Sequence, residues 1–318
     1  MIKLLLGTST WLPFESLTWR GTENQASREI DFTIASNPYD VNFQNITINL
    51  GDIVHLFDDT NQLFVGVVTN RERTAEIGTA SFTAKDFLHY LLRSSTSKAF
   101  KKKTPEAIAK NLLKEIGANE GSIISTKYKI KKAIYQDTCI YDIIIGAYRK
   151  ASASTGQNYM LTMDGSKVNV VMKGEDSGVT LDADKDITSA TYNDTTDNMI
   201  NKVIIYNKQG TKKAGKVQNA GNVKNFGIYQ TTYTKEDGVN ARSAAKKLLV
   251  GITEDASVEA VGNVKAVSGK LIVIHDSATG LSGNFYITQD EHTFQNGVHT
   301  MSLGLSRRNT MEEGADGN

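Results

Sequence analysis

Two histidines near the C-terminal end, His292 and His299, have the spacing that best suits chemistry. Asn296-Gly297 between them is a strong signal for a two-residue hairpin turn, so His292 faces Met301. By the same register Phe294 faces His299, and both imidazoles lie on one face, diagonal to each other. Two ligands make at most half of a tetrahedral zinc site, and no nearby cysteine offers a third. We interpret both as hydrogen-bonded structural histidines, and we predict no metal, cofactor or catalytic site.

The acidic residues make a weaker case for chemistry. Asp182-x-Asp184-x-Asp186 has the spacing that begins a calcium-binding loop. Ile187 stands where such a loop needs glycine, and Asn193 where it needs a bidentate glutamate. Asp86 and Asp142 begin or lie in predicted helices, where capping or exposure to solvent explains them. No two carboxylates stand out as an acid–base couple, although residues distant in sequence can still form one.

Other catalytic patterns do not occur. Gly269-Lys270 lacks the upstream glycine of a phosphate-binding loop, and the sequence has neither a zinc-protease helix nor a Gly-x-Ser-x-Gly nucleophile elbow. The one cysteine, Cys139, starts an apolar helical stretch and is interpreted as a small buried hydrophobe. A single cysteine excludes an intramolecular disulfide framework and suits a reducing cytoplasm. We therefore expect a protein that is not an enzyme.

Charge is balanced overall but uneven along the chain. The 318 residues include 36 Lys and Arg against 35 Asp and Glu, and 39% are apolar, as in ordinary soluble proteins. Between Arg93 and Lys132 we count eleven basic residues against three Glu. Lys101–Lys103 and the lysines at 127, 129, 131 and 132, with Tyr128 and Tyr135 nearby, could track a phosphate backbone. We favour instead the solvated face of a strand, or a docking surface for an acidic partner.

Targeting signals are not evident in the sequence. The apolar run in Met1–Gly7 is too short for a signal peptide. No segment approaches the eighteen or so apolar residues needed to span a bilayer. We therefore expect a protein made in the cytoplasm, without a membrane partner.

The first 94 residues are predicted to form mostly strands. Apolar and polar residues alternate over 30–34 and again over 46–50, which is the period of a half-buried strand. Strands at 53–57, 63–68 and 80–84 follow, and 85–93 has helical spacing. We expect this region, residues 1–94, to be one domain.

The middle and the end of the chain follow different patterns. Thr104-Pro105-Glu106 is a helix start and Gly117 its stop, and a second helix is predicted over about 138–153. Strands at 159–163 and 168–172, joined by Asp164-Gly165, complete a small α/β module at 95–185. A second β domain follows at 186–310, with a strand at 202–206, a mobile loop at 209–225 and one helix near 241–249. A flexible tail is expected at 311–318.

Two stretches far apart in the chain have the same pattern. Gly51 matches Gly269 and Asp58 matches Asp276 at the same offset. After a loop three residues longer in the second stretch, Phe64 matches Phe285. An isolated hairpin cannot bury its apolar face, so each stretch implies a small sheet or barrel around it. Two hairpins also align this well by chance, and the pattern alone leaves both explanations open.

The order of motifs along the whole chain resembles a known family. These motifs are Trp19-x-Gly21, Ala26-Ser27-Arg28 with the strand at 30–34, Asn49 to Val54, Leu63 to Val68, Thr83 to Asp86, Asn201-Lys202-Val203, Phe285-Tyr286-Ile287, and His292 to Leu303. Each is a degenerate strand or turn pattern, but their order and spacing are fairly specific. The chain looks like the tail hub proteins of PBSX-type phages and related tailocins, which are kin to late control protein D and to the N-terminal part of VgrG.

The resemblance implies an α+β, β-dominated fold, with two similar small β-barrel domains in one chain and an α/β module inserted between them. It implies that three chains close into a ring of pseudo-sixfold symmetry, which joins a sixfold tail tube to a threefold spike. The partners so implied are two further copies of the chain, the spike, the tail tube or its initiator, and other baseplate proteins, with a lumen that DNA can pass. The location so implied is the tail baseplate of a virion or tailocin particle, assembled in the bacterial cytoplasm.

Two other functions stay open on the sequence. The basic segment at 93–132 allows a nucleic-acid-binding β-barrel protein, which predicts steeply salt-dependent DNA binding. A site assembled from distant residues allows a wall hydrolase, which predicts activity on peptidoglycan.

Overall fold

Thirteen strands of the computed structural model join into one sheet, in the order β14-β18-β21-β20-β3-β4-β7-β6-β5-β1-β2, with β19 beside β20 and β13 beside β19. The structure describes residues 1–23, 25–37, 39–72, 77–311 and 314–317. The strands of this sheet are β1 (Ile2–Leu6), β2 (Thr10–Leu12), β3 (Phe14–Thr22), β4 (Gln25–Ser36), β5 (Ile53–Asp58), β6 (Asn61–Glu72), β7 (Gly78–Asp86), β13 (Asp176–Asp182), β14 (Ile187–Thr195), β18 (Thr253–Val261), β19 (Leu271–Asp276), β20 (Leu281–Gln295) and β21 (Val298–Ser306).

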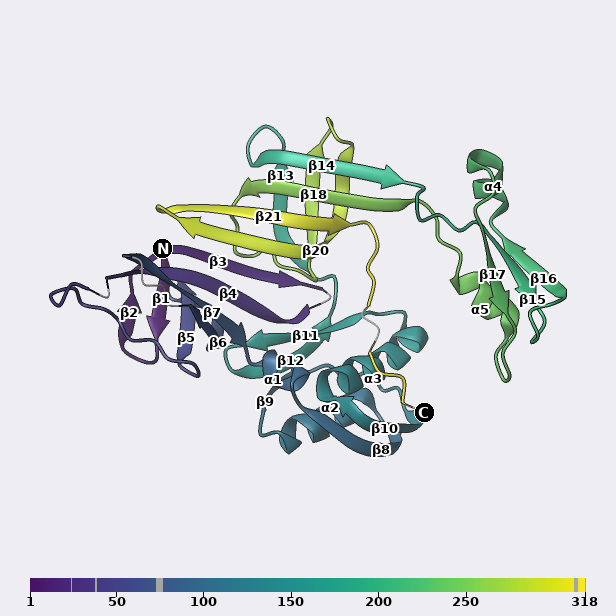
Figure 1. Cartoon of the computed structure of the whole chain (residues 1–318), viewed down its shortest axis with the longest axis horizontal. Coiled ribbons are helices and arrows are strands. Elements are labelled where there is room, and N and C mark those ends of the chain that lie inside the picture. Colours follow the sequence, from purple (N-terminus) through teal and green to yellow (C-terminus); the bar gives the residue numbers. More distant parts are fainter. Residues whose placement is uncertain (24, 38, 73–76, 312–313, 318) are drawn as a thin grey trace. The chain divides into compact units, whose positions relative to one another are not determined.

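The two ends of the chain meet in this sheet. Figure 1 shows β3 and β4, near the N-terminus, beside β20 and β21, near the C-terminus, and β20 pairs antiparallel with β3. Apolar side chains of both regions share one core, where Leu17, Trp19 and Phe32 pack with Phe294. The β-dominated fold is therefore confirmed. In the described part of the chain no strand pairing joins β2 to β14 or closes either half into a barrel.

The duplication predicted from the sequence has a counterpart in the strand order. In the first half β5, β6 and β7 form a meander, and in the second half β19, β20 and β21 form another. Gly51 N donates to Val68 O over 2.9 Å, and Gly269 N donates to Ile287 O over 2.8 Å. Both glycines have positive φ, +91° and +86°, which favours glycine at these two turns.

The equivalence continues beyond these turns. Val68 N donates back to Asp52 O, and Ile287 N donates back to Lys270 O. The ladder of β6 with β7 shifts register just after Val68, and the ladder of β20 with β21 shifts just after Ile287. Such shifts mark β-bulges, which increase the local twist. The two meanders thus share their turn, their register and their bulge.

The structure corrects one detail of the predicted match. The pairing with β5 and β19 makes Phe64 equivalent to Gly283, and Gly66 equivalent to Phe285. A Cβ at Gly66 would overlap Cζ of Phe64, so the Phe64 ring covers the position that Phe285 holds in the second copy. The connection is 59–60 in one copy and 277–280 in the other, two residues longer rather than three. The match of Phe64 with Phe285 is therefore wrong by two residues.

Another expected strand is not one. Residues 46–50 have the alternation of a strand but form extended coil without a strand partner in the described residues. Ile48 is buried, whereas Leu50 is 59% exposed. Ile48 and Ile46 pack into the core from this coil, and Arg71 Nη1 donates to the Ile48 carbonyl over 2.9 Å. Alternating apolar and polar residues indicate that one side of a segment is buried, and here the segment with one buried side is a coil.

An α/β module lies between the two β regions in sequence. Its elements are α1 (Leu88–Leu92), β8 (Ser95–Lys103), α2 (Pro105–Glu115), β9 (Asn119–Ile123), β10 (Ile130–Cys139), α3 (Ile140–Thr155), β11 (Tyr159–Asp164) and β12 (Lys167–Met172). Thr104 caps α2 as predicted, because its Oγ1 accepts from Ala107 N over 3.4 Å. The α3 helix and the β11–β12 hairpin also confirm the predicted elements. The apolar faces of α2 and α3 pack in one core with residues of β8, β10, β11 and β12.

Residues Thr191–Ala256 form a compact unit of their own, separate from the unit of Met1–Ala190 with Ser257–Asn318. Beyond the ends of β14 and β18, this smaller unit contains β15 (Lys202–Tyr206), β16 (Lys213–Gln218), α4 (Ala220–Phe226), β17 (Gln230–Thr234) and α5 (Ala241–Lys247). Its core is formed by Val203, Ile205 and Ala245. The predicted strand at 202–206 is confirmed, and the loop predicted at 209–225 instead contains β16 and α4.

The domain boundaries at 94 and 185 stay a prediction. Of the tail predicted at 311–318, residues 312, 313 and 318 lie outside the described residues. Ala315 N donates to the Asp142 carbonyl of α3 over 2.9 Å, which places this part of the tail against the helix. Across the described residues, none of the helices combines the length and apolar character that crossing a membrane requires.

Candidate functional site

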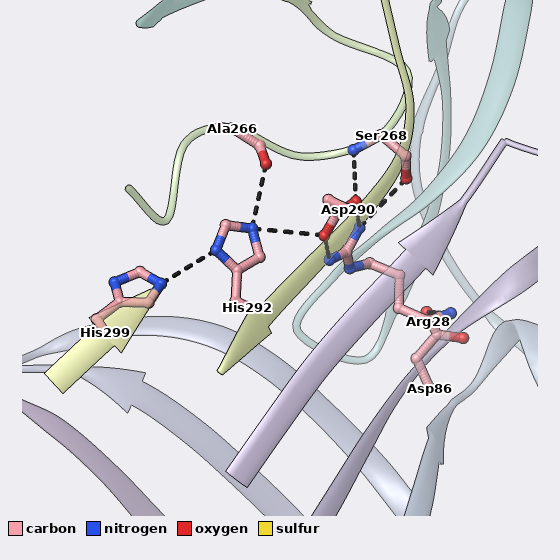
Figure 2. Close-up of polar contacts among 7 residues, drawn as sticks. All are labelled: Arg28, Asp86, Ala266, Ser268, Asp290, His292 and His299. Carbon is pink, nitrogen blue, oxygen red and sulfur yellow. Dashed lines mark hydrogen bonds and ion pairs between the residues drawn. The ribbon is translucent and has the colours of Figure 1, made fainter. Parts of the chain in front are cut away.

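The junction between the two β regions contains a buried ion pair. Arg28 on β4 donates from Nη1 to Asp290 Oδ1 on β20 over 2.9 Å, and its Nη2 bonds the other carboxylate oxygen (Figure 2). Ser268 N adds a bond to Asp290 Oδ1 at 2.6 Å. The Asp290 side chain is fully buried and that of Arg28 is 21% exposed. A bidentate pair with a third donor satisfies the carboxylate, as a buried charge requires.

The strand between β4 and β20 is β3, and the Arg28 side chain crosses it to reach Asp290. Gly21 on β3 pairs with Asp290, and a Cβ at Gly21 would overlap the Arg28 guanidinium. The guanidinium Cζ also lies 4.2 Å from the centroid of the Trp19 ring, a cation–π distance. The sequence motif Trp19-x-Gly21 followed by Arg28 is therefore one structural device. It places the Arg28 guanidinium over the Trp19 ring and within hydrogen-bonding distance of Asp290 in the second β region.

The two histidines extend this network along β20. His292 faces Met301 and Phe294 faces His299, as predicted. His292 Nε2 lies 3.1 Å from the Ala266 carbonyl, and His292 Nδ1 lies 3.1 Å from His299 Nε2. A carbonyl only accepts, so His292 carries its proton on Nε2 and accepts at Nδ1 from His299. Each imidazole is then neutral, and the pair forms a directed chain that ends on the backbone.

Burial lowers the pKa of both histidines to about 4. His292 is fully buried against Trp19, with ring centroids 5.1 Å apart. Its Nε2 also lies 3.5 Å from Asp290 Oδ2, which opposes the effect of burial on the pKa without cancelling it. The interpretation of both as hydrogen-bonded structural residues agrees with these contacts. In the part of the chain that the structure describes, no three His, Cys, Asp or Glu side chains are placed to hold a metal ion.

Asp86 has the predicted place at a helix start, but it is buried and has a second partner. Its Oδ1 accepts from Leu88 N over 3.1 Å at the start of α1, which is the expected capping role. Its Oδ2 accepts from Arg28 N over 3.0 Å, and the side chain is buried rather than exposed. Burial raises its pKa to about 6. Asp86 therefore ties the end of β7 to the strand that carries Arg28.

The other acidic candidates have separate structural roles. Asp182 Oδ1 lies 2.8 Å from His275 Nδ1, and Asp186 Oδ2 accepts from Asp182 N over 3.1 Å. The first contact joins β13 to β19, and the second closes the turn between β13 and β14. Among the described residues the three aspartates do not form a group that could hold a metal ion. Asp142 lies in the first turn of α3 as predicted, half-buried. Cys139 is also half-buried, and burial raises its thiol pKa.

The basic segment forms the expected solvated strand face only in part. Lys101 on β8 lies directly opposite Lys132 on β10, and both are exposed. The strand predicted to begin at Lys127 begins only at Ile130, because Lys127 has φ of +57° and the residues before β10 are coil. The solvated strand face is therefore confirmed for β8 and β10 but not for Lys127 and Lys129.

A partly enclosed cavity adjoins the Arg28 site. Its volume is about 370 Å³, and it is lined by Trp19, Arg28, Tyr159, Met160, Lys173 and Glu23, among others. Lys173, 5% exposed in its side chain, forms an ion pair with Glu23 and donates to the Thr310 carbonyl over 2.5 Å. Of the three cations that line the cavity, Arg28 and Lys173 are paired with carboxylates of the same chain, and Lys270 is the third.

Sequence reasoning missed the role of Arg28 and did not single out Asp290 at all. Arg28 stood inside a recognised motif, but nothing local to it indicated a partner so far along the chain. The available signal was Gly21, a glycine within a predicted strand, which often marks close approach of another group.

Comparisons with known proteins agree on the class of protein. A family model described as YQBQ-like matches residues 17–306. The chain is 27% identical to the phage-like element PBSX protein XkdQ of Bacillus subtilis (strain 168), over 99% of each. The 43 kDa tail protein of prophage MuSo2 from Shewanella oneidensis has a TM-score of 0.73 at 15% identity, covering 96% of this chain and 97% of that one. The E. coli c3393 protein, a type VI secretion component structurally similar to T4 tail proteins gp27 and gp5, has a TM-score of 0.54 at 12% identity, covering 99% and 79%.

Proposed function

The chain belongs to the YQBQ-like family, and from this premise we propose that it is the structural hub of a contractile-tail baseplate, in a phage or in a phage-tail-like bacteriocin. In this proposal three copies form a ring that joins the tail tube to the central spike. The similarity to a PBSX protein and to the fold of prophage tail proteins extends over nearly the whole chain and supports a tail protein. The partners are the spike, the tube or its initiator, and other baseplate proteins.

The duplicated meander is the observation that carries the hub role. Gly51 with Val68, and Gly269 with Ile287, make the same reciprocal backbone bonds in the two halves of one sheet. Three chains with two such regions each present six similar regions around one axis. Such a ring has threefold symmetry on the side of a trimeric spike and near-sixfold symmetry on the side of a tube. Ring closure also covers strand edges that would otherwise promote aggregation.

The proposed protein is not an enzyme. Both Nη atoms of Arg28 bond the Asp290 carboxylate, and His292 Nε2 lies close to that carboxylate and to the Ala266 carbonyl. Their contacts account for them as joints of the fold. We infer that purified chain is inactive on peptidoglycan, which separates the hub from a wall hydrolase.

Solution mass tests the hub. Multi-angle light scattering over a range of protein concentrations is expected to give a mass near three chains. If the chain is monomeric alone, the hub predicts that it forms the ring with its spike or tube, and co-purification with them should then recover three copies. A chain that stays monomeric at every concentration and in the presence of both partners would overturn the proposal.

A second candidate function rests on the basic strands. Lys101 and Lys132 face each other in the open, and like charges directly opposite each other destabilise a ladder unless something neutralises them. A polyanion such as DNA would do so, either as a primary ligand or while passing through a ring. Retention of duplex DNA at low salt that falls steeply with added salt would favour this function. Absence of binding at low salt would dismiss it.

A further inference from the structure

We propose that neighbouring copies of this chain join by pairing the C-terminal part of β6 with the edge strand β14 of the next copy, and that Arg71 of one copy forms an ion pair with Glu254 of the next. The occupant of this surface is a second copy of the chain. The inference rests on the proposed ring, and it specifies which strands and which charges close it.

Within one chain, β20 joins the two β regions because it pairs with a strand of each. The first half of β20, residues 281–286, pairs with β19. After the bulge, residues 289–295 pair with β3 of the other β region. One long strand therefore has two successive neighbours along the same edge. The second neighbour is the joint between the two β regions.

The edge of β6 is equivalent to this edge of β20. Its first half pairs with β5 up to Val67. Beyond the bulge, Asn70, Arg71 and Glu72 pair with β7 on one side, and the described residues include no strand on the other. By the shared register, Arg71 corresponds to Asp290. The place that β3 takes beside β20 is thus open beside β6.

The strand that fits beside β6 is β14. The order β3-β4-β7-β6-β5 of the first half corresponds to β14-β18-β21-β20-β19 of the second. β14 therefore stands in the place of β3, and it is the terminal strand of the sheet. Thr188, Ser189 and Thr191 are exposed along it, and it has none of the proline or lysine residues that commonly protect free edges. Head-to-tail pairing of β6 with β14 repeats the β20–β3 joint between chains.

The same correspondence between the two repeats predicts the Arg71–Glu254 ion pair. Ser36 pairs with Gly78 at the end of β4, and Gly262 N donates to His299 O just after β18. Aligning these two ends places buried Ile30, Phe32 and Ile34 on buried Ala256, Val258 and Ala260. The same alignment places Arg28 on Glu254, which is exposed. The internal pair Arg28–Asp290 then becomes Glu254–Arg71, with both charges reversed.

Arg71 is already held in the matching position. Its Nη1 donates to the Ile48 carbonyl at 2.9 Å and to Asn49 Oδ1 at 3.2 Å. Asp290 contacts the equivalent segment of the second repeat in the same chain, where it accepts from Ser268 N. Because both signs are reversed, the pair between chains attracts as the internal pair does. Four positions that carried charges by chance would have no reason to keep this attraction.

Charge reversal tests the pair. Arg71→Glu and Glu254→Arg, made separately, should each raise the dissociation constant between copies on the order of tenfold or more, because like charges then meet in the joint. The double variant should restore assembly to within a few-fold of the native chain. Glu259→Arg, exposed on the opposite face of β18, is the matched control and should assemble normally. Native assembly by both single variants would overturn the proposed joint.

A second measurement does not depend on weakening the fold. Arg71→Lys keeps the positive charge and supplies an amine, so a zero-length carbodiimide should link position 71 to Glu254 only in covalent oligomers. Mass spectrometry of the digested oligomer is expected to find that peptide pair, and its absence from oligomers would overturn the joint. A native ring that is insensitive to the reversals and lacks this link refutes only the joint. A chain that never assembles refutes the ring as well.

Discussion

Arg28 and Asp290, 262 residues apart in the chain, form a bidentate ion pair across Gly21. The pair joins β4 of the first β region to β20 of the second, and β3 lies between them. The two halves of a duplicated protein are therefore fastened by a charge pair as well as by a strand ladder. The network continues from His292 on β20 to His299 on β21, which lies on the side of β20 opposite to β3.

Removing the Asp290 charge should destabilise the fold. In Asp290→Asn the largely buried Arg28 guanidinium loses its counter-ion, and we expect the free energy of unfolding to fall by about 3 kcal/mol. Urea unfolding followed by tryptophan fluorescence measures this, since Trp19 lies against the guanidinium. Glu15→Gln, an exposed carboxylate on β3, should change the free energy by less than about 0.5 kcal/mol. Equal effects of the two substitutions would contradict the assigned role.

Stability should depend on pH through two buried groups, His292 and Asp86, and the half-buried His299. The pKa of His292 and of His299 is lowered to about 4, so their contribution is present above the unfolded value of about 6.5 and is lost as pH falls towards 4. The pKa of Asp86 is raised to about 6, so its contribution is present below about 4 and is lost as pH rises through 6. Near pH 5 the two histidines outweigh the one carboxyl, and stability rises with pH by about 1.4 kcal/mol per unit.

Two variants separate these opposing groups. His299→Gln keeps an amide donor for His292 Nδ1 and should flatten the slope of unfolding free energy against pH between 4.5 and 6. Asp86→Asn should steepen the same slope by about 1.4 kcal/mol per pH unit. Urea titrations at several pH values measure both. A slope that moves in the same direction in both variants would refute the assignment.

Gly66 should tolerate no side chain. A Cβ there would overlap the Lys85 carbonyl oxygen as well as the Phe64 ring, and the backbone of a paired strand cannot move aside. Gly66→Ala should lower the free energy of unfolding by about 3 kcal/mol. Gly215→Ala is the control, because its added Cβ would lie 3.9 Å from the nearest atom, Ile205 Cδ1. Rescue of Gly66→Ala by Phe64→Leu would show that the ring alone, and not the carbonyl, sets the limit.

The lysine pair on β8 and β10 separates stability from DNA binding. Lys132→Glu faces Lys101 directly and should raise the free energy of unfolding by about 0.5 kcal/mol. Lys129→Glu makes the same charge change in coil, without a cross-strand lysine, and should leave stability unchanged. If the basic surface binds DNA, both should lower retention equally at low salt. Stabilisation by both substitutions would indicate general charge repulsion instead of the specific pair.

The sequence alone determined the local elements of this protein. Thr104 and Pro105 define the start of α2, Asn296-Gly297 sets the register of His292 and His299, and the glycines of the two turns reveal the duplication. Caps, turns and alternation are properties of a few neighbouring residues, so they can be read without the fold. The order of such motifs was also enough to predict the family.

Only the tertiary structure decided what joins these elements. The β20–β3 ladder, the Arg28–Asp290 pair and the separate unit at 191–256 depend on residues that are distant in sequence. The sequence matched Phe64 with Phe285, but the strand pairing places Phe64 at Gly283 and Gly66 at Phe285, because a glycine and a ring exchange places between the two meanders. Strand pairing at long range adds no local pattern to either strand, so alternation predicts that a face is buried but not what covers it.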